Sequence, residues 1–276
     1  MRGKMDLNLK EYLERVRTVC PLVHHITNYV TVNDCANITL AAGASPVMAD
    51  DPREAADMTA LSQALVINMG TLNERTVSSM LASGKKANEC GIPVIFDPVG
   101  CGATAFRTET AKKILEGIRV SVMRGNISEI GCLCGLGSSA KGVDASAEDT
   151  EIDAVKTAKM AARLYHCVAV ITGEEDVVTD GDKTVLIANG CAEMAKITGT
   201  GCMCTSVIAS FCGASPANLR EAAAAGTVFM GLCGELAERN AGMHGLGSFR
   251  AAIFDAAGQM TGAMLEKGAK YHEAGN

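Results

Sequence analysis

Four short apolar segments, separated by stretches of helical periodicity, constrain the fold of this chain more than any other feature. They cover residues 64–68, 93–97, 120–124 and 168–172. Strands that are apolar along their whole length, rather than at alternate positions, are typical of a parallel sheet that helices cover on both faces. The sequence therefore predicts an α/β fold with a mostly parallel central sheet between two layers of helices.

Capping residues and hydrophobic periodicity indicate the remaining elements. Asn73, for example, suits a helix start, Val77, Met80 and Leu81 follow at helical spacing, and Gly91 ends the segment. No internal repeat, low-complexity segment or linker interrupts the chain, so we expect one domain over residues 1–276. We expect helices over residues 8–19, 33–43, 52–61, 73–91, 149–166, 202–213, 218–239 and 247–266, strands over 21–28 and 46–49, and an edge hairpin from 177–179 and 184–188.

Composition excludes several classes of partner. The formal net charge is −6 and no basic block is present, which argues against binding to nucleic acid or to an anionic membrane surface. No run of about 18 apolar residues exists, and charged residues rather than an apolar segment follow the first methionine. The twelve cysteines include no C-x-x-C pair and many lie in apolar segments, as reduced core residues do. We expect a cytoplasmic protein.

Each of the four apolar segments ends in polar or glycine residues. These ends are 68–70 (Asn-Met-Gly), 97–100 (Asp-Pro-Val-Gly), 124–126 (Arg-Gly-Asn) and 172–173 (Thr-Gly). In an open α/β sheet, ligands bind in the crevice outside the carboxyl ends of the strands. One such ending would be an ordinary turn, but four of them predict a binding site along this edge of the sheet.

A glycine-rich turn before a helix predicts where an anion binds. Residues 197–203 read Ile-Thr-Gly-Thr-Gly-Cys-Met and precede a run of small, helix-compatible residues. Unpaired amides and the helix dipole make such a helix start a phosphate site, so Gly199, Thr200 and Gly201 are candidates to stabilise a phosphoryl group. The alternative is a simple loop. Cys202 stands where a phosphotransfer site would more usually carry a carboxylate base, and its alternative role is that of a small residue in a tight helix start.

The segment from Arg124 to Glu129 offers phosphate and metal ligands. The guanidinium of Arg124 matches phosphate oxygens, and oxygen donors such as Asn126 and Glu129 suit Mg²⁺ held partly through water. Asp97 is a further candidate metal ligand. Each has a structural alternative, because Asn126 and Glu129 also fit a capping box and Asp97 fits a turn.

Residues near the N-terminus are candidates to contact the substrate. His24 and His25 lie at a strand end, where histidines more often make structural hydrogen bonds than touch a ligand. Met48 is of a type usually found in the core, but Asp50 and Asp51 beside it indicate a position near an opening.

Taken together, these motifs resemble the hydroxyethylthiazole kinase family. The resemblance covers roughly residues 10–266 and rests on these segments in order: 21–28 (Pro-Leu-Val-His-His-Ile-Thr-Asn), 33–37, 43–49 (Gly-Ala-Ser-Pro-Val-Met-Ala), 97–103, 124–130, 198–202 and 247–249. It implies a ribokinase-like three-layer α/β/α fold and the phosphorylation of 4-methyl-5-(2-hydroxyethyl)thiazole by ATP with Mg²⁺, a step of thiamine salvage. It also implies a homotrimer with the thiazole bound where subunits meet.

The resemblance assigns roles to individual residues. Met48 and Gly199, with Asn28 and Gly70 as weaker candidates, would bind the thiazole. Arg124 and Thr172 would bind ATP, and Asn126 is a further candidate for contact with the phosphates or the metal. Asp97 and Glu129 would serve the metal. Cys202 stands at the position of the catalytic base.

Two rival functions stay open at this stage. One is a ribokinase-like kinase of another small alcohol, of the hydroxymethylpyrimidine or pyridoxal type, against which the segment 24–28 (His-His-Ile-Thr-Asn) speaks. The other is a relative that binds nucleotide without turnover. A dinucleotide-dependent dehydrogenase is disfavoured, since no G-x-G-x-x-G follows the first strand.

Overall fold

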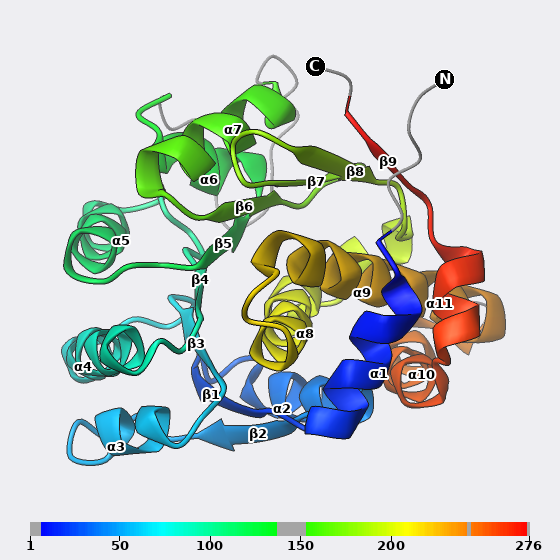
Figure 1. Ribbon diagram of the computed structural model, residues 1–276, viewed down its shortest axis with the longest axis horizontal. Helices are drawn as coiled ribbons and strands as arrows, with labels where there is room; N and C mark the ends of the chain where they lie inside the picture. Colours follow the sequence, from blue (N-terminus) through cyan, green and yellow to red (C-terminus); the bar gives the residue numbers. More distant parts are fainter. Residues whose placement is uncertain (1–6, 137–152, 242–243, 275–276) are drawn as a thin grey trace.

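Nine strands form one sheet in the part of the chain that the computed structural model describes, which comprises residues 7–136, 153–241 and 244–274. Their order across the sheet is β2-β1-β3-β4-β5-β6-β7-β8-β9 (Figure 1). The strands are β1 (Leu22–Ile26), β2 (Ser45–Met48), β3 (Ala64–Asn68), β4 (Val94–Asp97), β5 (Val122–Gly125), β6 (Val168–Ile171), β7 (Asp176–Thr179), β8 (Thr184–Ile187) and β9 (Tyr271–Glu273).

The pairing confirms a mostly parallel sheet. Every pairing from β2 across to β6 is parallel, and every pairing from β6 to β9 is antiparallel. The carboxyl ends of β1 to β6 consequently lie at the same edge of the sheet. The expected strand ends converge there, as the sequence predicts.

Helices cover both faces of the sheet (Figure 1). On one face lie α3 (Ala55–Ala60), α4 (Glu74–Cys90), α5 (Ala105–Gly117), α6 (Ile127–Leu133) and α7 (Ala154–Tyr165). On the other lie α1 (Leu9–Val19), α2 (Val32–Ala42), α8 (Thr200–Ala214), α9 (Leu219–Ala241), α10 (Leu246–Gln259) and α11 (Gly262–Gly268). This three-layer α/β/α arrangement confirms the expected fold class.

Side chains of the central strands alternate between two apolar cores. In β3, Leu65 and Ile67 pack with the cluster under α4 to α7, while Ala64 and Val66 pack with the cluster under α8 and α9. Because both sets are buried, the strand is apolar at every position before Asn68, which explains the pattern that predicted it. Among the described helices, none is long and apolar enough to cross a membrane.

The structure adds elements that the sequence interpretation left out. Helix α5, the short 3₁₀ helix η2 (Ala192–Lys196) and strand β9 were not expected. Strand β9 pairs with β8, so the predicted hairpin of β7 and β8 forms but is not the outermost part of the sheet. Helix α5 begins at Thr104, whose hydroxyl caps the N–H of Arg107, yet it buries few apolar residues and so leaves a weak periodic signal.

Two predicted helices differ at their ends. The segment expected as one helix over 247–266 is divided into α10 and α11, because Thr261 is extended and its hydroxyl accepts from the N–H of Met264 to start a new helix. For the helix expected over 149–166, residues 149–152 lie outside the described residues. Its described part begins after Asp153, whose carboxylate caps the N–H of Lys156.

Helix α9 approaches its neighbours through glycines. A Cβ added at Gly226 would lie 3.0 Å from the Cα of Ile208 in α8, and one added at Gly231 would lie 2.6 Å from the carbonyl oxygen of Asn189. Both contacts are with backbone atoms, which have no rotamer to relax, and the contact at Gly231 is the closer of the two. Glycine at this position therefore sets how closely α9 packs against the segment that follows β8.

We expect Gly231→Ala to lower the free energy of unfolding by about 2 kcal/mol or more, because the added methyl group meets a backbone carbonyl. Gly258→Ala in α10 is the matched control: its Cβ would have open space, so the better helix propensity of alanine should stabilise by up to about 1 kcal/mol. Urea unfolding of both variants measures the difference. Equal stability of the two variants would contradict this account of the packing.

Candidate functional site

A buried aspartate links three strands to α8 at the carboxyl edge of the sheet. Asp97, the last residue of β4, is fully buried, and its Oδ2 accepts from Asn68 Nδ2 at 2.9 Å and from Thr205 Oγ1 at 2.7 Å. Arg124 Nη1 lies 3.9 Å from the same oxygen. Burial raises the pKa of Asp97, and the charge of Arg124 and the two hydrogen bonds act against that rise. Its Oδ1 has no hydrogen-bond partner among the described residues.

Glu129 closes the loop after β4 against the start of α6. Its Oε1 accepts from the N–H of Gly100 at 2.7 Å, and its Oε2 accepts from the N–H of Asn126 at 2.9 Å. The side-chain oxygen of Asn126 in turn accepts from the N–H of Glu129, which completes the capping box. Burial, followed by the charge of Asp97, raises the pKa of Glu129 to about 7.

The capping box does not decide between a structural role and a ligand-binding role for Asn126 and Glu129. The structural role of Asn126 and Glu129 is present, and a carboxylate that caps a helix retains lone pairs for a cation. The predicted metal role of Glu129 and the predicted ATP contact of Asn126 stay predictions.

Arg124 lies against the first turn of α8. A Cβ at Gly201 would be 2.6 Å from Arg124 Nη1, so glycine is required for the guanidinium to reach this position. Arg124 Nη2 also donates to Thr172 Oγ1 at 2.5 Å, which brings the two predicted ATP ligands into contact. Its Nε is buried with no hydrogen-bond partner among the described residues. The geometry thus presents a guanidinium beside a helix N-terminus, where both favour a bound anion.

The turn before α8 has the geometry that its glycines predict. Gly199 is the N-cap residue with φ of 93°, and a Cβ there would also lie 2.6 Å from the side chain of Thr31. The hydroxyl of Thr200 donates to the carbonyl of Met194 at 3.0 Å, so this side chain fastens the turn to η2. What the turn offers a ligand is therefore the backbone amides of 199–201.

Cys202 lies in the same crevice, within reach of two asparagines. Its Sγ accepts from Asn68 Nδ2 at 3.2 Å and from Asn28 Nδ2 at 3.4 Å. Burial, followed by the charge of Asp97, raises the pKa of this thiol. A thiol in this environment is largely protonated near neutral pH, so it is a weak base.

Three residues predicted to bind the substrate, Asn28, Met48 and Gly70, lie at or just after the carboxyl ends of β1, β2 and β3. Asn28 follows β1 and is buried, and a Cβ at Gly70 would lie 2.6 Å from the side chain of Asn28. Met48 is the half-buried last residue of the edge strand β2, in register with His25 of β1. All three therefore belong to the edge at which Asp97 and Cys202 lie.

The two histidines have structural roles. His24 hydrogen-bonds Thr59 Oγ1 at 2.9 Å and the carbonyl of Ala49 at 2.8 Å, and His25 hydrogen-bonds the carbonyl of Val23 and Ser206 Oγ. Both are buried, and burial lowers the pKa of His25 to about 4. They hold β1 to its neighbours, as the more common interpretation of such histidines expects.

Sequence reasoning missed an arginine that clamps two loops of the site. Arg107 of α5 donates from Nη1 to the carbonyls of Met69 and Val99, at 2.6 and 2.7 Å, and from Nη2 to the carbonyl of Gly70 at 2.7 Å. These carbonyls belong to the loops that follow β3 and β4. Only the omitted helix α5 brings Arg107 here, so no local motif marked it.

We expect Arg107→Lys to lower the free energy of unfolding by about 1–3 kcal/mol, because one ammonium cannot replace a fork that joins three partly buried carbonyls. Arg163→Lys is the control, since its partner Asp182 is exposed and such pairs contribute at most about 1 kcal/mol. Thermal unfolding compares the two. If Arg163→Lys lowered the stability as much as Arg107→Lys, the proposed role of Arg107 in joining the two loops would be wrong.

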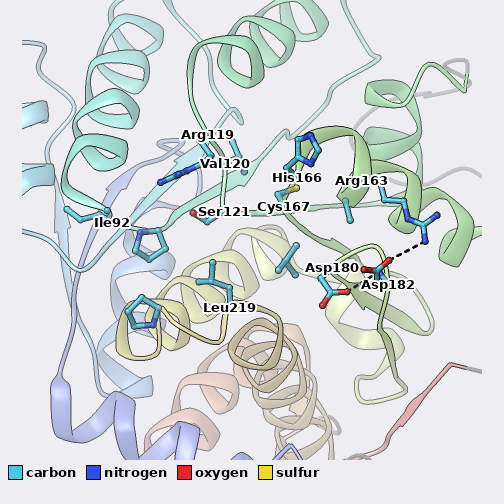
Figure 2. Close-up of a pocket in the computed structure, with 15 residues that line it drawn as sticks. Ile92, Arg119, Val120, Ser121, Arg163, His166, Cys167, Asp180, Asp182 and Leu219 are labelled. Atoms are coloured by element: carbon cyan, nitrogen blue, oxygen red, sulfur yellow. Dashed lines mark hydrogen bonds and ion pairs between the residues drawn. The ribbon is translucent and has the colours of Figure 1, made fainter.

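A cavity of about 710 Å³ lies at the opposite edge of the sheet (Figure 2). It is lined by Pro93, Ser121 and Cys167, which directly precede β4, β5 and β6, and by the paired side chains of Arg163 and Asp182. Its described lining residues include none of the predicted site residues. The carboxyl edge therefore remains the candidate active site.

Comparison with known proteins agrees with this geometry. Residues 13–262 match the model of the "Hydroxyethylthiazole kinase family". The hydroxyethylthiazole kinase of Clostridium beijerinckii is 51% identical over 276 residues, which cover 99% of this chain and 100% of the relative.

Solved structures agree as well. The hydroxyethylthiazole kinase protein from Pyrococcus horikoshii OT3 superimposes with a TM-score of 0.88 at 37% identity, over 97% of this chain and 99% of that one. A ribokinase-like superfamily protein from Enterococcus faecalis superimposes with a TM-score of 0.66 at 12% identity, over 92% and 94%, which confirms the ribokinase-like fold. The chain belongs to the hydroxyethylthiazole kinase family.

Proposed function

We propose that this protein transfers the γ-phosphoryl group of ATP to the hydroxyl of 4-methyl-5-(2-hydroxyethyl)thiazole, a step of thiamine salvage. The family membership supports the reaction. The observation that carries it in this chain is the contact of Arg124 with Gly201, which puts a guanidinium against the first turn of α8 within the same crevice as Cys202. Phosphoryl transfer needs chiefly this kind of alignment and charge stabilisation.

The nucleotide would lie along Arg124 and Thr172. The free Nε of Arg124 and the amides of 199–201 supply donors for phosphate oxygens, and Asn126 at the start of α6 is a further candidate contact. Gly201 lets the arginine and the amides act on the same phosphoryl group. Their role is to neutralise charge on the triphosphate while the γ-phosphoryl group moves.

The residues at this edge fit Mg²⁺. Asp97 has an oxygen without a hydrogen-bond partner, and Glu129 keeps lone pairs beyond its two N–H contacts. Among the described residues no three His, Cys, Asp or Glu side chains form a complete set of ligands. Mg²⁺ in nucleotide enzymes needs no such set, because it is bound by one or two carboxylates together with phosphates and water. When bound, it would neutralise phosphate charge.

The thiazole alcohol would lie between the β1, β2 and β3 loops and the turn at Gly199. Met48 would contact the ring, with Asn28 and Gly70 beside it, and the hydroxyl would approach the side chain of Cys202. The thiolate form of Cys202 would accept the hydroxyl proton as the phosphoryl group is transferred, and Cys202 would end the step as the neutral thiol. Because the raised pKa keeps most molecules in the thiol form, only a small fraction would carry this base at neutral pH, which predicts modest turnover.

We also propose that the chain forms a homotrimer with the thiazole sites at subunit interfaces. Tyr29 and Val30, which directly follow Asn28, are 79% and 57% exposed, and the edge strand β2 is half-buried along its length. Exposed apolar side chains beside a ligand site are typical of an interface. Sedimentation equilibrium at a mass other than three times 28.6 kDa would refute this assembly.

The reaction is tested by coupled assays of ADP release with the thiazole alcohol, pyridoxal and hydroxymethylpyrimidine in turn. We expect turnover that requires Mg²⁺ and prefers the thiazole alcohol. Preference for another alcohol would assign a different substrate, and nucleotide binding without turnover would identify a non-catalytic relative.

We expect Cys202→Asp to retain activity within about tenfold of the wild type, because a carboxylate accepts a proton at least as well as a mostly protonated thiol. Steady-state turnover with saturating ATP measures this. Cys202→Ala, which removes the acceptor, should be slower than Cys202→Asp. Abolished turnover in a folded Cys202→Asp protein would contradict this role for the position.

The pKa of Glu129 predicts how Mg²⁺ affinity depends on pH. With a pKa of about 7 in the metal-free protein, the carboxyl is mostly protonated at pH 6 and mostly ionised at pH 8. Since a proton competes with the cation, the apparent Mg²⁺ affinity should fall roughly tenfold from pH 8 to pH 6. Titration of activity against Mg²⁺ measures it, and Glu129→Gln should bind more weakly without this change between the two pH values.

A further inference from the structure

Asn68 joins the two groups on which the proposed chemistry depends. It is the buried last residue of β3, and its Nδ2 donates both to Asp97 Oδ2 at 2.9 Å and to Cys202 Sγ at 3.2 Å. Its Oδ1 accepts from the N–H of Gly70 at 2.9 Å and from Asn28 Nδ2 at 2.9 Å. Both the oxygen and the nitrogen of this amide therefore have two hydrogen-bond partners each.

The orientation of the amide follows from its partners. The N–H of Gly70 can only donate, so the atom of Asn68 that faces it must be the oxygen, and the NH₂ group must face Asp97 and Cys202. The same reasoning applies to Asn28, because its Oδ1 accepts from both the N–H and the hydroxyl of Thr31, at 3.1 and 3.0 Å. Two NH₂ groups thus point at the sulfur of Cys202.

Two fixed donors make position 202 a place for a hydrogen-bond acceptor. A neutral thiol accepts hydrogen bonds weakly, whereas a thiolate or a carboxylate accepts them strongly. Other groups that act on this sulfur are the carboxylate of Asp97, the hydroxyl of Thr31, the guanidinium of Arg124 and the thiol of Cys35 on α2. Like the two amides, the Thr31 hydroxyl favours negative charge on the sulfur. Of these, Asp97 opposes negative charge on the sulfur and Arg124 favours it, so the amides add to the favourable side.

We propose that Asn68 is a positioning residue, which holds the side chain at position 202 as an acceptor directed at the substrate hydroxyl and ties that position to Asp97. The inference rests on the proposed role of Cys202 in the phosphoryl transfer. Because Asn68 acts through the side chain at position 202, it controls the rate of the chemical step more than the binding of substrate.

The test compares Asn68→Asp with Thr205→Val. Asn68→Asp preserves shape and keeps an oxygen facing Gly70 and Asn28, but it replaces the NH₂ donor to Cys202 and Asp97 with oxygen. Thr205→Val removes the other donor to Asp97 and contributes no donor to Cys202 in the described contacts. Because Asn68→Asp also places a second carboxyl beside Asp97 and Cys202, Asn68→Leu is measured with the pair. It removes the donor without adding charge and should show the same losses, which separates the missing hydrogen bond from added charge and from an effect on Asp97 alone.

Two readouts are made on each full-length variant. The first is the rate at which iodoacetamide alkylates Cys202 at one fixed pH, measured by peptide mass spectrometry relative to the exposed Cys20 and Cys90 of the same sample. The second is the steady-state kcat and KM for the thiazole alcohol. Alkylation needs no turnover, so it reports on position 202 even if the proposed function is wrong.

For Asn68→Asp we expect relative alkylation of Cys202 to fall several-fold, roughly threefold or more, and kcat to fall roughly tenfold or more, with KM changed by no more than about twofold. Thr205→Val should leave alkylation unchanged. Should Asn68→Asp not fold, Asn68→Ser, which shortens the donor, takes its place with the same expectations.

Two results would overturn the inference. Unchanged alkylation in Asn68→Asp would show that Asn68 acts through Asp97 alone, whatever happens to kcat. A rise in KM with unchanged kcat would assign it to substrate binding. A wild-type protein without thiazole kinase activity would instead refute the proposed function, and in that case the alkylation result alone decides whether Asn68 directs position 202.

Discussion

The buried carboxylate of Asp97 is the interaction on which the rest of the candidate site depends. A charge removed from water is costly unless it is paired, and here Asn68, Thr205 and Arg124 provide the compensation. These partners come from β3, α8 and β5. The aspartate therefore holds two neighbouring strand ends and the first turns of α8 in one arrangement, and its buried Oδ1 has no hydrogen-bond partner among the described residues.

Glycines allow the elements of this arrangement to approach one another closely. Gly201 lets Arg124 lie on the first turn of α8, and Gly199 takes a left-handed backbone conformation beside Thr31. Around them, Arg107 and Glu129 fix the loops after β3 and β4 through backbone carbonyls and amides. The candidate site is thus held by side chains that bind backbone, which fixes the loops around the turn at 199–201 without a ligand.

Much of this was accessible from the sequence. The apolar strands, the strand-end polar residues and the glycine turn predicted the sheet and the edge at which Asp97, Arg124 and Cys202 meet. The sequence did not reveal the roles of Arg107 and Asn68, because no local motif marks either role. Arg107 depends on a helix with a weak apolar stripe, and the hydrogen bonds of Asn68 join residues that are 29 and 134 positions apart.

The sequence by itself determined the layered α/β architecture and the glycine turn at the start of α8, because periodicity and glycine placement act over a few residues. Tertiary structure alone decided which hydrogen-bond partners each polar residue has. His24 and His25 became buried structural groups, Asn126 and Glu129 formed a capping box, and two asparagine NH₂ groups converged on Cys202. Hydrogen bonds across distant strands are set by how the sheet and α8 pack, and no local pattern records that packing.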